Sequence, residues 1–276
     1  MAAGEIAYAK LNLALHVRRR EADGYHAIET LFAFCEDGDA LAIGDTPGLT
    51  VTGPFADAIA ERAENLVTRA ARGFAAAMGN ALVAGFALEK RLPVAAGIGG
   101  GSADAAATLR LLCHGHGLPP EDARVTALAE TLGADVPGCL LSRTSWGMRR
   151  GDRLEPAPDA LAGVPVLLVN PRVPLSTGEV FAGWDGVDRG PLGRGDPLAA
   201  ALAGRNDLEP PAIARLPVIG GVLALLRAQA GATLVRMSGS GATCFALFDR
   251  ASARDAADAR VAAARPDWWR LATRLR

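Results

Sequence analysis

Glycines are concentrated in one short stretch of the chain, residues 93–103, which reads Pro-Val-Ala-Ala-Gly-Ile-Gly-Gly-Gly-Ser-Ala. Glycine permits positive φ angles and lets another molecule approach the backbone closely. Directly afterwards, Ser102 can cap a helix, and the alanine-rich run from Ala103 favours one. A glycine loop that leads into a helix presents backbone N–H groups and the positive end of the helix dipole. The stretch is therefore predicted to bind an anion, usually phosphate, in preference to being only a flexible loop.

Two charged side chains elsewhere in the chain could face a ligand. Lys10 lies in residues 6–17, where apolar and polar residues alternate, so it is predicted on a strand with one face in the core. Lys10 and Asn12 then point the same way, about 7 Å apart. Asp135 follows a predicted helix and precedes the next. Lys10 could be solvated or line a pocket, and Asp135 could cap the next helix or face a ligand.

The elements that must position these residues follow from turns and hydropathy. An Asp-Gly turn within residues 22–26 predicts a second strand that returns beside the first through Phe34, with Tyr25 and His26 near one end of the sheet. Further strands are predicted at 40–52 and 82–90. Helices are predicted at 57–79, 103–115 and 121–133.

The second half of the chain has its own set of predicted elements. Its strands are expected at 164–170 and on either side of a glycine turn within 233–248, and its helices after Pro211, at 220–231 and at 251–264. Residues 185–197 are expected to form an exposed loop. A change of composition near residue 148 predicts two domains, 1–148 and 149–276.

Composition limits the classes of function. The chain has 29 Lys and Arg against 30 Asp and Glu, which argues against nucleic acid held mainly by phosphate neutralisation. The four cysteines are scattered, as expected for buried thiols in a reducing compartment. No signal peptide or membrane-spanning run is evident. We therefore expect a soluble cytoplasmic protein with neither a nucleic-acid nor a membrane partner.

Three familiar phosphate-binding loops do not fit residues 93–103. No Gly-Lys-Ser/Thr follows the glycines, as a P-loop requires. The lysine, His-Arg-Asp and Asp-Phe-Gly elements of protein kinases are also missing. A dinucleotide-binding fold would place an acid at a strand end about twenty residues on, but Glu121 begins a helix instead.

The stretch instead resembles the nucleotide motif of the GHMP kinase superfamily, Pro-x-x-x-Gly-Leu-Gly-Ser-Ser-Ala. It departs from that motif at Gly100 and Gly101, where most of the superfamily has serine. One branch, which phosphorylates 4-CDP-2-C-methyl-D-erythritol, has a triple glycine there. Six motifs of that branch are matched in order, at residues 9–13, 22–26, 93–103, 132–137, 206–208 and 238–242.

The resemblance implies a fold and an activity. The fold is α+β in two domains, an N-terminal ribosomal-protein-S5-domain-2-like domain and a C-terminal ferredoxin-like α/β sandwich, with the active site between them. The activity is transfer of the γ-phosphoryl group of ATP to the 2-hydroxyl of 4-CDP-2-C-methyl-D-erythritol, in non-mevalonate isoprenoid synthesis. Mg²⁺ is implied as a cofactor; its protein ligand is unknown, although the Ser102 hydroxyl is a candidate.

The resemblance also assigns roles to residues. Asp135 is expected to act as the base and Lys10 as its electrostatic partner. The residues expected to wrap the ATP phosphates are Pro93, Val94, Ala95, Ala96, Gly97, Ile98, Gly99, Gly100, Gly101, Ser102 and Ala103. Asp104 is placed in the first helical turn, where its charge favours the helix dipole.

Substrate contacts are implied for residues in both halves of the chain. His26 is expected to bind the cytosine edge, and Tyr25 and Phe181 to stack on the base. The remaining contacts are expected from Asn12, Thr177, Gly239 and Ser240. Phe181 could instead belong to the core, and Thr177 could be an ordinary turn residue.

Two other functions remain open at this point. One is a GHMP kinase acting on homoserine or a mevalonate-type alcohol, against which the Ala-Asp-Gly-Tyr-His motif argues. The other is a nucleotide-binding module without catalysis, against which the presence of both Lys10 and Asp135 argues.

Overall fold

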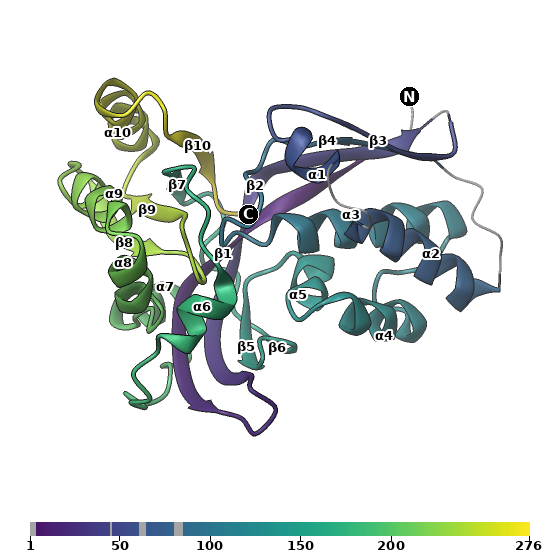
Figure 1. Cartoon of the computed structure of the whole chain (residues 1–276), viewed down its shortest axis with the longest axis horizontal. Coiled ribbons are helices and arrows are strands. Elements are labelled where there is room, and N and C mark those ends of the chain that lie inside the picture. Colours follow the sequence, from purple (N-terminus) through teal and green to yellow (C-terminus); the bar gives the residue numbers. More distant parts are fainter. Residues whose placement is uncertain (1–3, 45, 61–64, 80–84) are drawn as a thin grey trace. The chain divides into compact units, whose positions relative to one another are not determined.

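The computed structural model describes residues 4–44, 46–60, 65–79 and 85–276 (Figure 1). The chain packs into two compact units, each made of three segments: 1–10, 37–94 and 99–142 in the first, and 11–36, 95–98 and 143–276 in the second. The predicted domains, 1–148 and 149–276, are continuous in sequence, so their limits stay a prediction.

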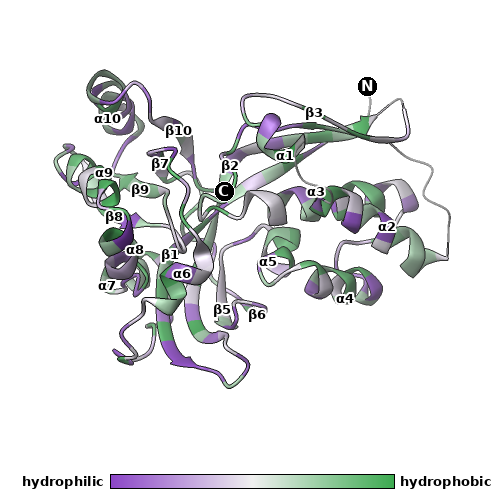
Figure 2. Ribbon diagram, in the orientation of Figure 1, coloured by the Kyte–Doolittle hydropathy of each residue, from purple (hydrophilic) through white to green (hydrophobic). Residues whose placement is uncertain are grey.

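Two long strands begin the fold. β1 (Gly4–Arg20) and β2 (His26–Gly44) pair with each other and are joined at the predicted Asp-Gly turn. β1 was expected to bury one face, but its residues are buried on both faces from Ala9 to Val17. Figure 2 shows its hydrophilic end in purple, beyond the hydrophobic stretches. The polar residues of its second face therefore lie inside the protein, which sets them up for specific contacts.

In the first unit, part of β2 forms a sheet with β3 (Gly48–Thr52) and β4 (Gly85–Glu89). The order is β3-β4-β2, with β4 antiparallel to β2 in the register Ala40 opposite Glu89. Helices of this unit are α1 (Asp57–Ala60), α2 (Leu66–Met78), α3 (Gly100–His116), α4 (Ala123–Leu132) and α5 (Val136–Leu141). α3 packs against α2, α4 and α5.

The sequence explains why α3 can lie at the centre of these helices. Seven consecutive residues, Ala103–Leu109, are buried. This part of the helix is therefore enclosed on every side, whereas an amphipathic helix buries only one apolar face. Four of them are alanines, whose small side chains let neighbouring helices approach closely. α2 is amphipathic in the ordinary way, with Val67, Ala70, Ala71 and Phe74 buried at helical spacing.

In the second unit, another part of β2 pairs with β5 (Ser145–Arg149), which pairs with β6 (Arg153–Pro156). A separate antiparallel sheet has the order β10-β7-β9-β8. Its strands are β7 (Pro165–Asn170), β8 (Ala232–Met237), β9 (Cys244–Phe248) and β10 (Trp269–Arg274). α9 (Val218–Arg227) and α10 (Ala251–Ala264) pack on it. This β-α-β-β-α-β order confirms the predicted ferredoxin-like domain.

Three shorter helices complete the second unit: α6 (Thr177–Ala182), α7 (Pro197–Ala203) and α8 (Glu209–Arg215). Among the predicted elements, the helix at 251–264 is confirmed at both ends. The helix predicted at 220–231 lies at 218–227, and β10 was not predicted. Residues 61–64 of the predicted helix 57–79 and residues 82–84 of the predicted strand 82–90 lie outside the described residues.

Candidate active site

Lys10 and Asp135 form an ion pair in the first unit. Lys10 lies on β1 and Asp135 directly precedes α5, and Lys10 Nζ donates to Asp135 Oδ2 over 3.1 Å. The Lys10 side chain is 6% exposed and the Asp135 side chain 37%. Asp135 occupies the N-cap position of α5 but makes no side-chain cap hydrogen bond, and Lys10 is buried, so its solvated alternative is wrong. The pair presents an accessible carboxylate held by a buried ammonium group.

The N-terminus of α3 lies directly against this lysine. A Cβ added at Gly99 would stand 3.1 Å from Lys10 Cε and 3.2 Å from Lys10 Cβ. Gly99 is the N-cap and has a φ of 66°, which a side chain would rarely adopt. Ser102 was predicted as the cap, but it lies inside the first turn. The backbone of the glycine loop therefore contacts the lysine of the ion pair.

The first turn of α3 offers donors for an anion. The first helical hydrogen bond runs from Ala103 N–H to Gly99 O (2.8 Å). The N–H groups of Gly100, Gly101 and Ser102 precede it, so they have no acceptor within the helix. Together with the helix dipole, they make an arrangement of donors suited to an anion, and phosphate binding there stays a prediction.

The middle of the loop, residues 95–98, belongs to the second unit and lies on the turn Ser238–Gly241. Ser238 Oγ donates to Gly97 O (2.9 Å), and Thr243 N–H donates to Ala96 O (3.1 Å). Gly97 has a φ of 75°, and a Cβ there would lie 2.5 Å from Ser238 O. The turn therefore packs against the middle of the glycine loop.

Several predicted substrate residues meet beside this turn. Asn12 is buried: its N–H donates to Ser238 Oγ (3.2 Å), and its Nδ2 donates to Thr30 Oγ1 (2.7 Å). A Cβ at Gly239 would lie 3.1 Å from Asn12 Oδ1. The hydroxyls of Thr177 and Ser240 are 2.9 Å apart. These residues form one polar cluster in the second unit.

His26 lies among aromatic side chains. Its ring centroid is 5.1 Å from that of Phe181 and 5.7 Å from that of Trp184, which the sequence did not single out. Burial, aided by the charge of Arg20, lowers the pKa of His26, so the imidazole is neutral at pH 7. Arg20 Nε donates to His26 Nε2 (3.4 Å), which assigns the imidazole proton to Nδ1.

Tyr25 is arranged differently from the other predicted aromatic residue. Its side chain is exposed, and the Arg150 guanidinium carbon lies 3.8 Å from its ring centroid. Arg150 also donates to the carboxylate of Asp23. The stacking role of Tyr25 stays a prediction, since here its ring face is covered by a cation.

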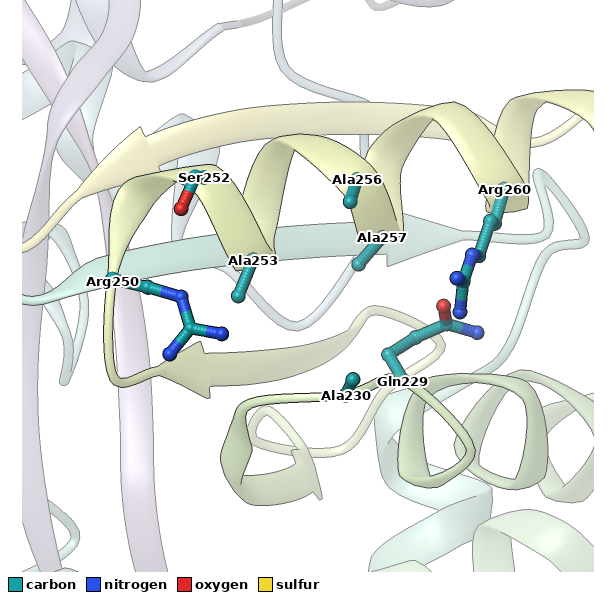
Figure 3. A pocket seen from close by; sticks show the side chains of 8 residues that line it. All are labelled: Gln229, Ala230, Arg250, Ser252, Ala253, Ala256, Ala257 and Arg260. Atoms are coloured by element: carbon teal, nitrogen blue, oxygen red, sulfur yellow. The ribbon is translucent and has the colours of Figure 1, made fainter.

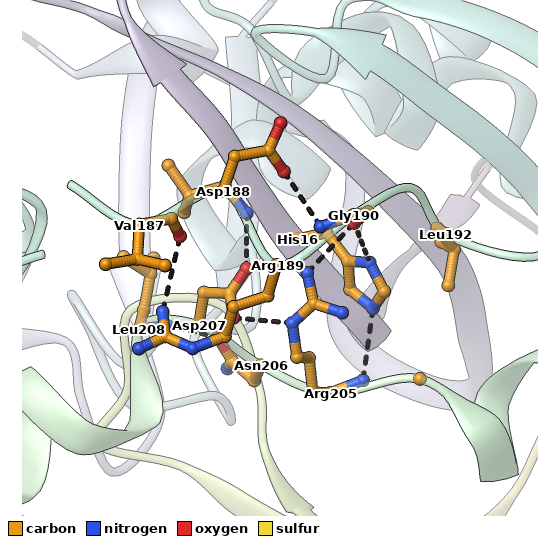
Figure 4. A network of polar contacts seen from close by, with 12 residues as sticks. His16, Val187, Asp188, Arg189, Gly190, Leu192, Arg205, Asn206, Asp207 and Leu208 are labelled. Atoms are coloured by element: carbon orange, nitrogen blue, oxygen red, sulfur yellow. Dashed lines mark hydrogen bonds and ion pairs between the residues drawn. The ribbon is translucent and has the colours of Figure 1, made fainter. Parts of the chain in front are cut away.

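The motif Asn206–Leu208 supports the turn and β1. Asn206 Nδ2 donates to Met237 O (2.7 Å) and Gly239 O (2.8 Å), and Asp207 Oδ2 accepts from Val17 N–H (2.8 Å). Figure 4 shows the surrounding network, in which His16 lies between Gly190 and the backbone N–H of Arg205. The motif is structural support for the polar cluster.

Asp104 was predicted to lie in the first turn of α3 and to stabilise the helix dipole. That prediction is wrong. It is buried, and its Oδ2 accepts from Lys90 Nζ over 2.7 Å. The same ammonium group donates to Asp39 Oδ2 over 2.5 Å. Burial, reinforced by Asp39 and opposed by Lys90, raises the pKa of Asp104 to about 7. Sequence reasoning did not identify this buried cluster of Lys90, Asp39 and Asp104.

Other features of the described residues do not form a site. Figure 3 shows a hollow between α10 and residues 229–230 that contains none of the predicted site residues, with Gln229 directed toward Arg260. The described residues contain no group of three or more His, Cys, Asp or Glu that could hold a metal ion. All four cysteines are buried and free, as predicted. Burial raises the pKa of Cys139 to about 12, so its thiol stays protonated.

The geometry thus gathers the predicted residues into sets within each unit. Lys10, Asp135 and the start of α3 (residues 99–103) meet in the first unit. Asn12, Thr177 and the turn Ser238–Gly241 meet in the second. No helix in the described part of the chain is long and apolar enough to cross a membrane.

Comparison with known proteins defines the family. A family model described as the GHMP kinases N terminal domain matches residues 65–143, and one described as GHMP kinases C terminal matches residues 188–265. Solved structures agree: a homoserine kinase from Cytophaga hutchinsonii, 16% identical, has the same fold with a TM-score of 0.65, covering 97% of this chain and 96% of that one. These matches define a GHMP kinase.

Closer relatives narrow the assignment. A 4-diphosphocytidyl-2-C-methyl-D-erythritol kinase of Rhizorhabdus wittichii is 64% identical, covering 99% of this chain and 94% of its own. The corresponding kinase of Novosphingobium aromaticivorans is 53% identical over 100% of this chain and 94% of its own. A crystal structure of 4-(cytidine 5'-diphospho)-2C-methyl-D-erythritol kinase is 36% identical, with a TM-score of 0.80 and 99% of both chains covered. The chain belongs to the 4-diphosphocytidyl-2-C-methyl-D-erythritol kinase family.

The raised pKa of Asp104 predicts a pH dependence of stability. In the unfolded chain an aspartate ionises near pH 4, whereas folded Asp104 keeps its proton to about pH 7. The folded state therefore binds the extra proton, and the free energy of unfolding falls as the pH rises from about 4 to 7. Asp104→Asn should remove this contribution, so the difference in unfolding free energy between wild type and variant should change across that range.

Urea unfolding at pH 4.5, 5.5, 6.5 and 7.5 measures this difference. Asp122→Asn is the control, because the pKa of Asp122, bonded to Arg124, is lowered to about 2 and its titration lies below the tested range. Parallel stability curves for wild type and Asp104→Asn would contradict the assignment.

Proposed function

We propose that this chain transfers the γ-phosphoryl group of ATP to the 2-hydroxyl of 4-CDP-2-C-methyl-D-erythritol. The observation that carries the proposal is the Lys10–Asp135 ion pair, which lies against Gly99 at the N-terminus of α3. A carboxylate, an ammonium group and a row of backbone donors are what phosphoryl transfer to an alcohol requires.

The glycine loop holds the ATP phosphates in this proposal. The N–H groups of Gly100, Gly101 and Ser102 donate to phosphate oxygens, and the dipole of α3 favours their negative charge. A Cβ at Gly101 would meet only Leu66, at the ordinary distance of 3.5 Å, so no packing contact requires glycine there. Close approach of the ligand to the backbone supplies the reason.

The residues present fit a Mg²⁺ ion carried by the nucleotide. Mg²⁺ in such sites is usually held by substrate phosphates and one or two protein oxygens, so a cluster of three carboxylates is unnecessary. The Ser102 hydroxyl, in the first turn of α3, is the candidate protein oxygen. When bound, Mg²⁺ would neutralise charge on the phosphate oxygens.

Asp135 and Lys10 divide the chemistry. The substrate hydroxyl gives its proton to the Asp135 carboxylate, its oxygen bonds to the γ-phosphorus, and the bond from that phosphorus to the ADP oxygen breaks. The exposure of Asp135 allows a substrate to reach it, whereas buried Lys10 is held in place. Lys10 orients the carboxylate through their hydrogen bond and stabilises negative charge on the phosphoryl group in transfer.

His26 recognises the cytosine in this proposal. With its proton on Nδ1, the neutral imidazole offers a donor to the acceptors on the cytosine edge. Partly buried Phe181 offers apolar surface for the base, and buried Trp184 packs beside the imidazole. Asn12 and Thr177 supply polar groups beside the turn Ser238–Gly241. Substrate choice therefore depends on the second unit.

Phosphorus NMR of the protein with Mg-ATP and each candidate alcohol tests the proposal. We expect ADP and a new phosphomonoester resonance with 4-CDP-2-C-methyl-D-erythritol, and neither with homoserine or mevalonate. A phosphomonoester with one of those alcohols instead would change the substrate assignment. ADP formation without any phosphorylated alcohol would contradict the proposed phosphoryl transfer to an alcohol.

Asp135→Asn should lower kcat by about 10²–10⁴-fold, because an amide cannot accept the hydroxyl proton. The dissociation constant for Mg-ATP, measured by calorimetry, should change little, since the backbone of the loop is untouched. Asp122, a half-buried residue that caps α4 and belongs to no predicted site, provides the control Asp122→Asn, whose kinetics should be unchanged. Loss of Mg-ATP binding in Asp135→Asn would show that Asp135 holds nucleotide instead.

His26→Phe should raise the KM for the cytidyl substrate by about 10-fold or more, because the ring packing is kept and one hydrogen bond to the base is lost. The KM for ATP should not change. Because the pKa of His26 is lowered, wild-type substrate KM should begin to rise only at a lower pH than protonation of an ordinary imidazole would predict. An unchanged substrate KM in the variant would contradict base recognition by His26.

A further inference from the structure

Lysine is rare in this chain, and both of its lysines lie against the same glycine run. Of the 29 Lys and Arg residues, only Lys10 and Lys90 are lysines. A Cβ at Gly99 would stand 3.1 Å from Lys10 Cε, and a Cβ at Gly100 would stand 3.2 Å from Lys90 Nζ. Lys10 belongs to the proposed chemistry. Lys90 is buried at 1% exposure and has no role in the reaction described above.

Lys90 is fixed from two sides. Its Nζ donates to Asp39 Oδ2 over 2.5 Å and to Asp104 Oδ2 over 2.7 Å. Both carboxylates are buried, and their attraction more than offsets the cost of burying the ammonium group, so the pKa of Lys90 is raised. The tip of a lysine is usually mobile, but this one has no room or solvent to move into.

The cluster of Lys90, Asp39 and Asp104 joins the two ends of the phosphate loop. Asp39 Oδ1 accepts from the N–H groups of Arg91 (2.6 Å) and Leu92 (2.8 Å), immediately before the loop begins. Asp104 follows Ala103, where the loop has become helix α3. All of these residues belong to the first unit, so the backbone entering the loop and the helix leaving it are held by one buried ion cluster.

The same geometry accounts for glycine at position 100. Gly97 and Gly99 have φ angles of 75° and 66°, so their backbone conformation alone favours glycine. Gly100 has no positive φ, and the atom closest to its missing Cβ is Lys90 Nζ. At 3.2 Å such a Cβ is tighter than ordinary contact, and Lys90 Nζ is too firmly held to yield. A side chain there would therefore displace either the ammonium group or the start of α3.

We propose that Lys90 is a positioning residue for the nucleotide phosphates. With Asp39 and Asp104 it fixes the first turn of α3, so that the N–H groups of Gly100–Ser102 are aimed before ATP arrives. Lys90 acts through the backbone, since its buried side chain does not reach a ligand. A guanidinium group is planar and wider than an ammonium group, so arginine does not fit under Gly100. The inference rests on the proposed function only in taking the bound anion to be ATP phosphate.

The test is the dissociation constant for Mg-ATP, measured by calorimetry on the full chain without the alcohol substrate. The variants are Lys90→Met, Gly100→Ala and the double variant. Gly115→Ala is the matched control, because Gly115 lies near the other end of the same helix, lacks a positive φ and has open space at its Cβ. Thermal unfolding of each variant is recorded alongside.

Each single variant should weaken Mg-ATP binding by about 10-fold, comparable to misplacing one or two charge-assisted hydrogen bonds. In the double variant, Mg-ATP affinity should fall by clearly less than the product of the two single-variant factors. Methionine ends one atom short of the Nζ position and leaves room for the new Cβ at residue 100. KM for ATP should rise in parallel, KM for the alcohol should not, and Gly115→Ala should bind Mg-ATP as wild type does.

Lower thermal stability of Lys90→Met with unchanged Mg-ATP affinity would assign Lys90 a purely structural role and overturn the proposal. If the two single substitutions weaken Mg-ATP binding by factors that simply multiply in the double variant, the link between Lys90 and Gly100 is overturned.

If Lys90→Met does not fold, the Mg-ATP affinities of Gly100→Ala and Asp104→Asn decide. Affinities within twofold of wild type in both variants would overturn the proposal. A chain that shows these binding effects but phosphorylates no alcohol contradicts the proposed function alone. Absence of Mg-ATP binding in wild type contradicts both.

Discussion

The start of α3 is the constraint on which the rest of the site depends. Backbone N–H groups can bind phosphate only where no side chain covers them and where no acceptor inside the helix takes them up. The chain meets the first condition with glycine at 99, 100 and 101, and the second by placing the phosphate site at the first helical turn. Glycine leaves this backbone intrinsically flexible, so something else must hold it in place.

Each unit supplies part of that support. In the first unit, Lys10 packs beneath Gly99, while Lys90 lies beneath Gly100 and is bound by Asp39 and Asp104. In the second, the turn Ser238–Gly241 contacts Gly97, and Asn206 in turn binds that turn. Three motifs that are distant in sequence, at residues 9–13, 206–208 and 238–242, thereby support one loop, together with the buried cluster of Lys90, Asp39 and Asp104.

Local patterns were good guides wherever a single element decided the outcome. The presence of strand β1, the glycine loop leading into α3 and the limits of α10 all followed from short-range periodicity and turn chemistry, although β1 is buried on both faces and not on one. Errors arose where a distant partner decided. Ser102 was expected to cap α3, but Gly99, whose φ is 66°, takes that position. Asp104 was expected to favour the helix dipole, but a buried lysine binds it.

The sequence by itself predicted a phosphate-binding glycine loop, and its ordered motifs indicated a GHMP kinase in which Lys10, Asp135 and His26 have the proposed roles. Such information is carried by residue type and order. Only the tertiary structure decided between capping and ion pairing for Asp135, added Trp184 beside His26, and joined Lys90 to Asp39 and Asp104. The physical reason is that a buried charge is stable only with a partner, and partners 14 to 125 residues apart come together only when the chain folds.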